Sequence, residues 1–82
     1  MNDEFPKRLR MLRERNRLKR YKLSELCGLS PDAVRRYECR EAEPTVNAVV
    51  QIAEYFEVSV DYLIGRSDYP NVLSPLPSRK KL

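Results

Sequence analysis

The side chains best suited to chemistry in this sequence are two adjacent arginines, Arg35 and Arg36, in the stretch CGLSPDAVRRYE. A guanidinium can donate hydrogen bonds to guanine O6 and N7 together, which gives roughly 1–3 kcal/mol of discrimination between bases. A second basic pair, Lys19 and Arg20, lies upstream and suits phosphate binding, which adds affinity without sequence information. These residue types favour recognition of a nucleic acid.

Catalysis and metal binding have little support in the sequence. The chain contains no histidine and only two cysteines, too few for a Cys/His zinc set. It also lacks a Gly-rich phosphate loop and a recognisable pair of catalytic carboxylates. We therefore expect a protein that is not an enzyme and needs no metal or cofactor. Cys27 and Cys39 are expected to be reduced thiols, the first in the core and the second on an outward face.

Charge is distributed unevenly along the 82 residues. Residues 1–22 hold nine basic and three acidic residues. Residues 23–65 hold three basic and eight acidic residues, and residues 66–82 hold four basic residues and one acidic residue. The net charge of the chain is +4. A basic block beside an acidic one predicts a face that meets a polyanion. No apolar run approaches the roughly 20 residues of a membrane span, and the charged start lacks a signal-peptide apolar region. We expect a soluble cytoplasmic protein with no membrane partner.

Apolar residues recur at helical spacing through the first 65 residues, without sustained strand-type alternation. The sequence therefore predicts an all-α fold, a compact five-helix bundle in residues 1–65. The first helix is expected to bury Phe5, Leu9 and Leu12. The other four are expected over about 20–27, 31–38, 46–56 and 60–64. Residues 66–82 contain three prolines and a basic end, and are expected to form an extended or disordered tail.

The last two expected helices have clear start signals. Thr45 and Ser59 are natural N-caps, and Gly65 is a natural end for the second of the two helices. Glu57 stands where a glycine often ends the first of them, so this residue is either mildly strained or the turn differs. The expected apolar stripe of residues 46–56 comprises Val46, Val49, Val50 and Ala53.

The stretch CGLSPD carries the signals of a turn between two helices. Gly28 can take the positive φ that ends one helix, and Leu29 can turn inward. Ser30 is the expected N-cap of the next helix, with Pro31 at its first position and Asp32 in its first turn. Two helices joined by a short turn containing glycine form the helix-turn-helix pattern, whose second helix enters the DNA major groove.

On these residues the sequence resembles the lambda-repressor-like (Cro/cI, Xre) helix-turn-helix family. The resemblance covers residues 9–65, with LKRYKLSELCGLSPDAVRRYE as the motif, EPTVNAVVQIAEYFEVS as the fourth helix and VDYLIG in the fifth. It implies a sequence-specific transcriptional regulator of bacterial or phage type, with repressor as the expected role. The partner that the resemblance implies is double-stranded DNA, so the protein is expected to be associated with the nucleoid.

The resemblance also implies roles for individual positions. The family's base-reading positions, with one neighbouring arginine, fall on Pro31, Asp32, Arg35 and Arg36. Its phosphate-contacting positions fall on Lys19, Arg20, Cys39 and Arg40. Pro31 has no N–H and a nonpolar ring, so it can only touch a thymine methyl. Glu41 and Glu43, in a loop that is usually basic, would repel a phosphate. The family also pairs two positions that here are Arg13 and Glu38, which implies a structural ion pair.

One recognition helix reads only a few base pairs, so we expect a two-fold homodimer on a pseudo-palindromic operator. The expected dimer contacts are apolar residues of the last helix: Val60, Tyr62, Leu63 and Ile64. The alternative is a protein-interaction module, such as an antitoxin whose tail neutralises a partner while the bundle autoregulates its operon. Absence of DNA binding would favour this alternative.

Overall fold

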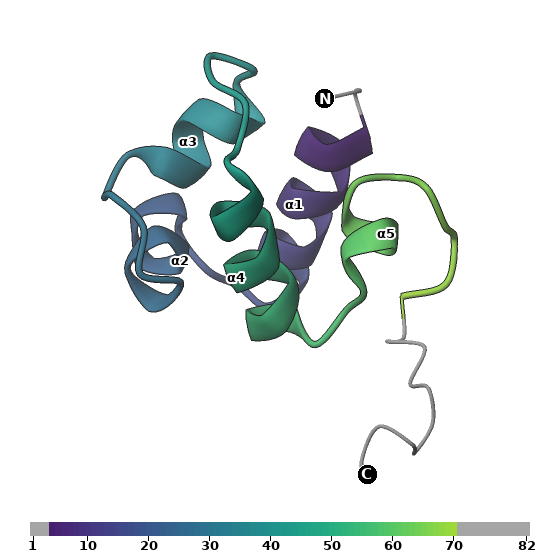
Figure 1. Ribbon diagram of the computed structural model, residues 1–82. Helices are drawn as coiled ribbons and strands as arrows, with labels where there is room; N and C mark the ends of the chain where they lie inside the picture. The colour runs from purple at the N-terminus through teal and green to yellow at the C-terminus, as the bar shows by residue number, and fades with distance from the viewer. Residues whose placement is uncertain (1–3, 71–82) are drawn as a thin grey trace, which may run out of the picture.

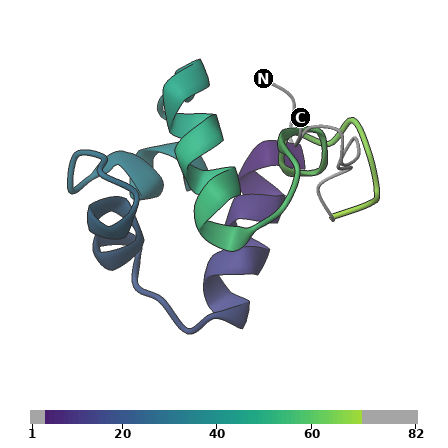
Figure 2. The ribbon, with the colours of Figure 1, turned by 60° about the horizontal axis from the view of Figure 1, so that its bottom comes forward.

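Five short helices make up the fold in the computed structural model, which describes residues 4–70. They are α1 (Glu4–Arg15), α2 (Arg20–Leu26), α3 (Ala33–Glu38), α4 (Val46–Phe56) and α5 (Val60–Leu63). In both ribbon views α2 and α3 lie on one side of α4 and α5 lies on the other (Figures 1 and 2). The predicted all-α, five-helix fold is confirmed. None of the helices in this part of the chain is long and apolar enough to cross a membrane.

The core draws side chains from all five helices. Phe5, Leu9 and Leu12 of α1 are buried, as their spacing predicts. The Phe5 ring meets the ring of Tyr37 from α3 edge to face, with centroids 5.9 Å apart. The other buried residues of this cluster are Leu23, Cys27, Val34, Val49, Ile52, Ala53, Val58 and Leu63. Burial of these side chains is the main source of stability, at roughly 25 cal/mol per Å² of apolar surface.

Helix α4 buries only half of the apolar stripe that its sequence predicts: Val49 and Ala53 are buried, as expected. Val46 is 82% exposed and Val50 is only partly buried. The buried residues of α4 are Ala48, Val49, Ile52 and Ala53. Apolar residues fill so much of this helix that more than one face satisfies helical periodicity. The face that packs includes Ile52, which buries a larger apolar side chain than Val46 would.

All five helices in the described chain are followed by a residue with positive φ. In order these are Arg17, Gly28, Arg40, Glu57 and Gly65. In each case the next residue donates its N–H to a carbonyl five positions back, at 2.8–3.1 Å, as in Leu29 to Ser24 and Val58 to Ala53. Only two of the five are glycines, although glycine alone adopts this conformation without a Cβ penalty. The other three positions therefore carry backbone strain.

Glu57→Gly is expected to raise the free energy of unfolding by roughly 0.5–1 kcal/mol. Glu57 has φ 59°, so glycine removes the backbone strain at this position. Part of the gain is offset because glycine raises the conformational entropy of the unfolded chain. Urea unfolding measures the change. As a control, Glu54→Gly places glycine inside α4 and is expected to cost about 1 kcal/mol. Loss of stability in Glu57→Gly would contradict the assignment of strain.

Residues 66–70 pack back onto the bundle through Arg8. Its Nη1 donates to the carbonyls of Tyr62 and Ser67, both at 2.7 Å, and its Nη2 to Asp68 at 3.1 Å. The Ser59 N–H donates to the carbonyl of Pro70 at 2.9 Å. The packed part of the chain thus continues past the domain end expected at residue 65. The rest of the predicted tail, 71–82, lies outside the described residues.

Candidate nucleic-acid interface

The turn between α2 and α3 has the geometry that its sequence predicts. Gly28 has φ 73°, and the Leu29 N–H donates to the Ser24 carbonyl at 2.8 Å. Leu29 is partly buried against the core. This turn sets α3 against α2, so one short helix presents its outer face on a fixed support.

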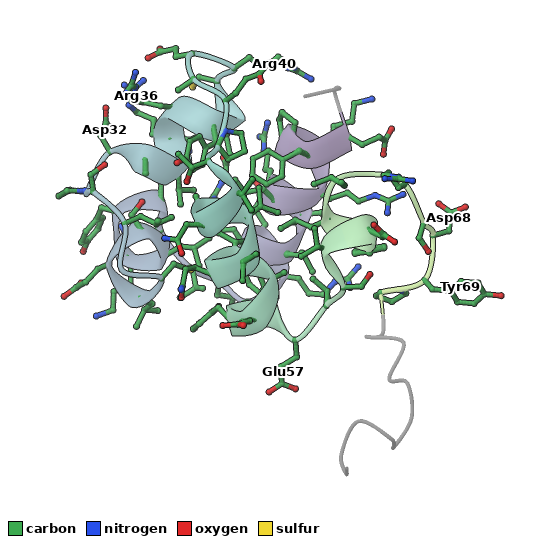
Figure 3. The ribbon with its side chains drawn as sticks, in the orientation of Figure 1. Asp32, Arg36, Arg40, Glu57, Asp68 and Tyr69 are labelled. Carbon is green, nitrogen blue, oxygen red and sulfur yellow. The ribbon has the colours of Figure 1, made fainter. Side chains whose placement is uncertain are left out.

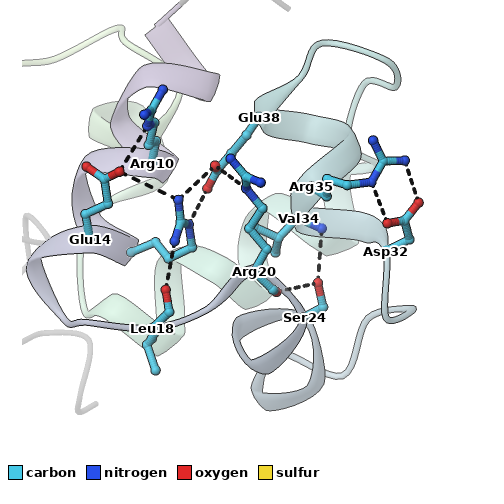
Figure 4. Close-up of polar contacts among 10 residues, drawn as sticks. Arg10, Glu14, Leu18, Arg20, Ser24, Asp32, Val34, Arg35 and Glu38 are labelled. Carbon is cyan, nitrogen blue, oxygen red and sulfur yellow. Dashed lines mark hydrogen bonds and ion pairs between the residues drawn. The ribbon is translucent and has the colours of Figure 1, made fainter.

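The start of α3 corrects one prediction. Ser30 was expected to cap this helix, but α3 begins at Ala33, whose N–H donates to the Ser30 carbonyl at 3.0 Å. The hydroxyl that serves the helix start belongs to Ser24, in the neighbouring helix. Ser24 is fully buried, and its Oγ accepts from the Val34 N–H at 3.0 Å (Figure 4). Residues 31–32 form a turn before the helix, and α3 begins without a side-chain cap from its own N-terminal residue.

Ser24→Ala is expected to lower the free energy of unfolding by roughly 1–2 kcal/mol, because it leaves the buried Val34 N–H without an acceptor. Ser30→Ala should change it by less than about 0.5 kcal/mol, as is usual for exposed positions. Urea unfolding of the two variants under one set of conditions compares them directly. If Ser30→Ala lowered the free energy of unfolding more than Ser24→Ala does, Ser30 would be the residue that caps α3.

The predicted ion pair between α1 and α3 is confirmed. Arg13 donates from Nε to Glu38 Oε2 at 2.6 Å and from Nη2 to Oε1 at 3.1 Å. Arg20, the first residue of α2, donates from Nε to the same Oε1 at 3.1 Å (Figure 4). The Glu38 side chain is only 2% exposed. One buried carboxylate therefore joins three helices and fixes the place of Arg20.

A groove of about 500 Å³ lies where the start of α2 meets the start of α3. It brings together five residues predicted to contact DNA: Lys19, Arg20, Pro31, Asp32 and Arg35. Arg13 and Tyr21 complete its lining. Tyr21 is 59% exposed and was not among the predicted site residues. An aromatic residue directly after a basic pair, in KRYK, is the signal that would have identified it.

The two arginines of α3 differ in the hydrogen bonds that their side chains make. Arg35 donates from Nε and Nη2 to Asp32, both at 2.7 Å, and from Nη1 and Nη2 to Glu41 at 3.1 and 3.2 Å. These contacts hold the pKa of Asp32 below its ordinary value, chiefly through the hydrogen bonds from Arg35. Arg36 is exposed and has no hydrogen bond or ion pair from its side chain to the rest of residues 4–70. Figure 3 shows it at the upper left edge of the molecule, above Asp32.

The cysteines occupy the places predicted for them. Cys27 is buried, and burial raises the pKa of its thiol to about 11. Cys39 is a free, exposed thiol directly after α3, and the exposed Arg40 follows it. Both positions lie at the end of the outward-facing helix, outside the groove, and their contact with DNA stays a prediction.

The predicted dimer contacts on α5 divide into two pairs. Val60 and Ile64 line an apolar hollow of about 150 Å³, together with Pro44, Val46, Val49 and Val50. Leu63 is fully buried in its own core, so the prediction that it contacts a second chain is wrong. Tyr62 is partly covered, because the Arg8 guanidinium lies 4.3 Å from its ring centroid. Leu63 is the one residue of this four-residue helix that is buried.

Two helices, α2 and α3, joined by a short turn at Gly28 define a helix-turn-helix protein. The chain belongs to the helix-turn-helix family, which it matches over residues 9–63. It is 34% identical over 78 residues to an uncharacterized HTH-type transcriptional regulator, YobD, of Bacillus subtilis (strain 168), across 95% of this chain and 67% of that protein.

Two solved structures have a similar fold. One is the P22 c2 repressor protein crystallised with synthetic operator 9T, with a TM-score of 0.70 and 24% identity over 77% of this chain and 96% of that chain. The other is the solution structure of the P22 c2 repressor DNA-binding domain, with a TM-score of 0.70 and 26% identity over 84% and 91%. These similarities confirm the lambda-repressor-like fold.

Proposed function

We propose that this protein is a sequence-specific DNA-binding transcriptional regulator, a repressor that acts by occupying its operator. The observation that carries the proposal is an outward-facing α3, fixed on α2, that presents the unbonded guanidinium of Arg36. The helix-turn-helix family and the similarity to an HTH-type transcriptional regulator of B. subtilis support it. Occupancy of a site needs no catalytic group, and a regulator of this kind works on nucleoid DNA in the cytoplasm.

In this proposal α3 enters the major groove and Arg36 bonds a guanine edge. Lys19 and Arg20 contact phosphates beside the groove, because both stand at the start of α2 and are exposed. Glu38 holds Arg20 by its Nε, which leaves the terminal nitrogens for a phosphate. The remaining proposed contacts are Pro31, Asp32 and Arg35 toward bases and Cys39 and Arg40 toward the backbone.

The functional unit is proposed to be a two-fold dimer on a pseudo-palindrome. The hollow lined by Val60 and Ile64 is apolar, and Val46 at its edge is 82% exposed. An exposed apolar patch of this kind suits a self-complementary contact between two copies. Sedimentation with operator DNA should then show two chains per site.

Selection of bound sequences from a random duplex pool tests the proposed function. We expect an enriched inverted repeat whose half-sites lie about 10 bp apart. Enrichment of no sequence would overturn the proposal, and a single unrepeated half-site would overturn the dimer.

A further inference from the structure

We propose that Glu41 is a specificity-determining residue, which together with Asp32 withholds Arg35 from the phosphates of non-cognate DNA. The inference rests on the proposed function and deepens it. Arg35 lines the groove between α2 and α3 and is predicted to contact DNA, yet most of its donors already bond to carboxylates. The acidic loop after α3 then has a role beyond simple repulsion.

Hydrogen-bond capacity is the first argument. A guanidinium has five N–H groups. Four of those of Arg35 already point to carboxylate oxygens of Asp32 and Glu41. The one that remains is insufficient for the two parallel bonds that guanine or a phosphate accepts. Arg35 therefore contacts DNA fully only after a carboxylate releases it.

The backbone after α3 places Glu41 for this contact. Arg40 has φ 61°, and the Glu41 N–H donates to the Arg36 carbonyl at 2.8 Å. This closure turns the chain back toward the helix, so the Glu41 side chain meets Arg35, six positions earlier. Asp32 meets it from the other side, three positions before Arg35 on the same surface. The guanidinium is held from both ends of α3.

The contact is weak enough to be displaced. The side chains of Arg35 and Glu41 are 39% and 51% exposed, and exposed ion pairs contribute little free energy. A cognate site offers guanine O6 and N7, which can accept two hydrogen bonds from Arg35 in place of the two to Glu41. On non-cognate DNA the Glu41 carboxylate competes with a phosphate for the Arg35 guanidinium. While Glu41 keeps the guanidinium, that phosphate contact does not form, and binding lacks the free energy of its counterion release.

The test is a double-mutant cycle on binding to a duplex of arbitrary sequence. We measure the dissociation constants of wild type, Glu41→Gln, Arg35→Ala and the double variant between about 50 and 200 mM salt. Glu41→Gln should bind about threefold to tenfold more tightly than wild type, and its log–log salt slope should steepen by about 0.9, one phosphate contact. In the Arg35→Ala background the same substitution should have little effect.

Simple repulsion between Glu41 and the backbone would give the same gain in both backgrounds, and that result would overturn the inference. Glu54→Gln on α4 makes the same change in net charge away from the interface and should leave the salt slope unchanged; a steeper slope would overturn it as well. Thermal unfolding verifies that each variant is folded. A wild type that binds no duplex refutes the proposed function, whereas binding without coupling refutes only the role of Glu41.

Discussion

Replacement of Glu38 by alanine should lower the free energy of unfolding by about 3–5 kcal/mol, the usual cost of removing one partner from a buried ion pair. The substitution leaves the Arg13 guanidinium, whose side chain is 11% exposed, without its carboxylate. It also removes the acceptor of Arg20 and so the polar link among α1, α2 and α3. Urea unfolding monitored by circular dichroism measures the loss.

An exposed ion pair on α2 provides the control for Glu38. Glu25 Oε1 lies 3.6 Å from Lys22 Nζ, and the two side chains are 68% and 50% exposed. Glu25→Ala should cost less than about 1 kcal/mol, since solvent replaces the lost partner. Similar costs for Glu25→Ala and Glu38→Ala would mean that burial does not set the strength of the Arg13–Glu38 pair.

Arg36→Ala should reduce the preference for the operator over arbitrary DNA by about tenfold to a hundredfold, because a two-bond contact with guanine discriminates by roughly 1–3 kcal/mol. Arg36 is exposed on α3, and its side chain makes no hydrogen bond or ion pair within residues 4–70. Its removal should therefore leave the free energy of unfolding almost unchanged. Competition binding with the selected operator and a scrambled duplex measures the ratio.

Lys19→Ala is the matched control for Arg36→Ala, because it removes one positive charge from the same interface. It should weaken binding to operator and scrambled duplex alike and flatten the log–log salt slope by about 0.9. An unchanged preferred sequence in Arg36→Ala would assign base reading to another residue of α3.

Local signals in the sequence were sufficient where one helix or one turn decides the outcome. The spacing of Phe5, Leu9 and Leu12 predicts their buried face, and a glycine before a partly apolar turn predicts the positive φ of Gly28. The resemblance to a known family predicted the pairing of Arg13 with Glu38. The first two features depend on periodicity and backbone preference, which act over a few neighbouring residues. The Arg13–Glu38 pair joins two helices and was predicted only through the resemblance.

The tertiary structure decided which of several locally equivalent groups makes each contact. Ser24 and Ser30 both carry a hydroxyl near the turn, yet only Ser24 is buried beside the free N–H of Val34. Arg35 and Arg36 are adjacent in sequence, and only the return of the loop after α3 brings Glu41 to the first of them.

The sequence by itself thus determined the helices, the turn and the location of the basic residues, because these follow from propensities and side-chain chemistry along one stretch of chain. Packing alone decided that α4 buries Ala48 and Ile52 rather than Val46 and Val50 and that Leu63 points inward. It also decided that Arg35 is bonded while Arg36 is not. The physical reason is that burial and ion pairing depend on the distance between side chains from different elements, which the assembled bundle sets.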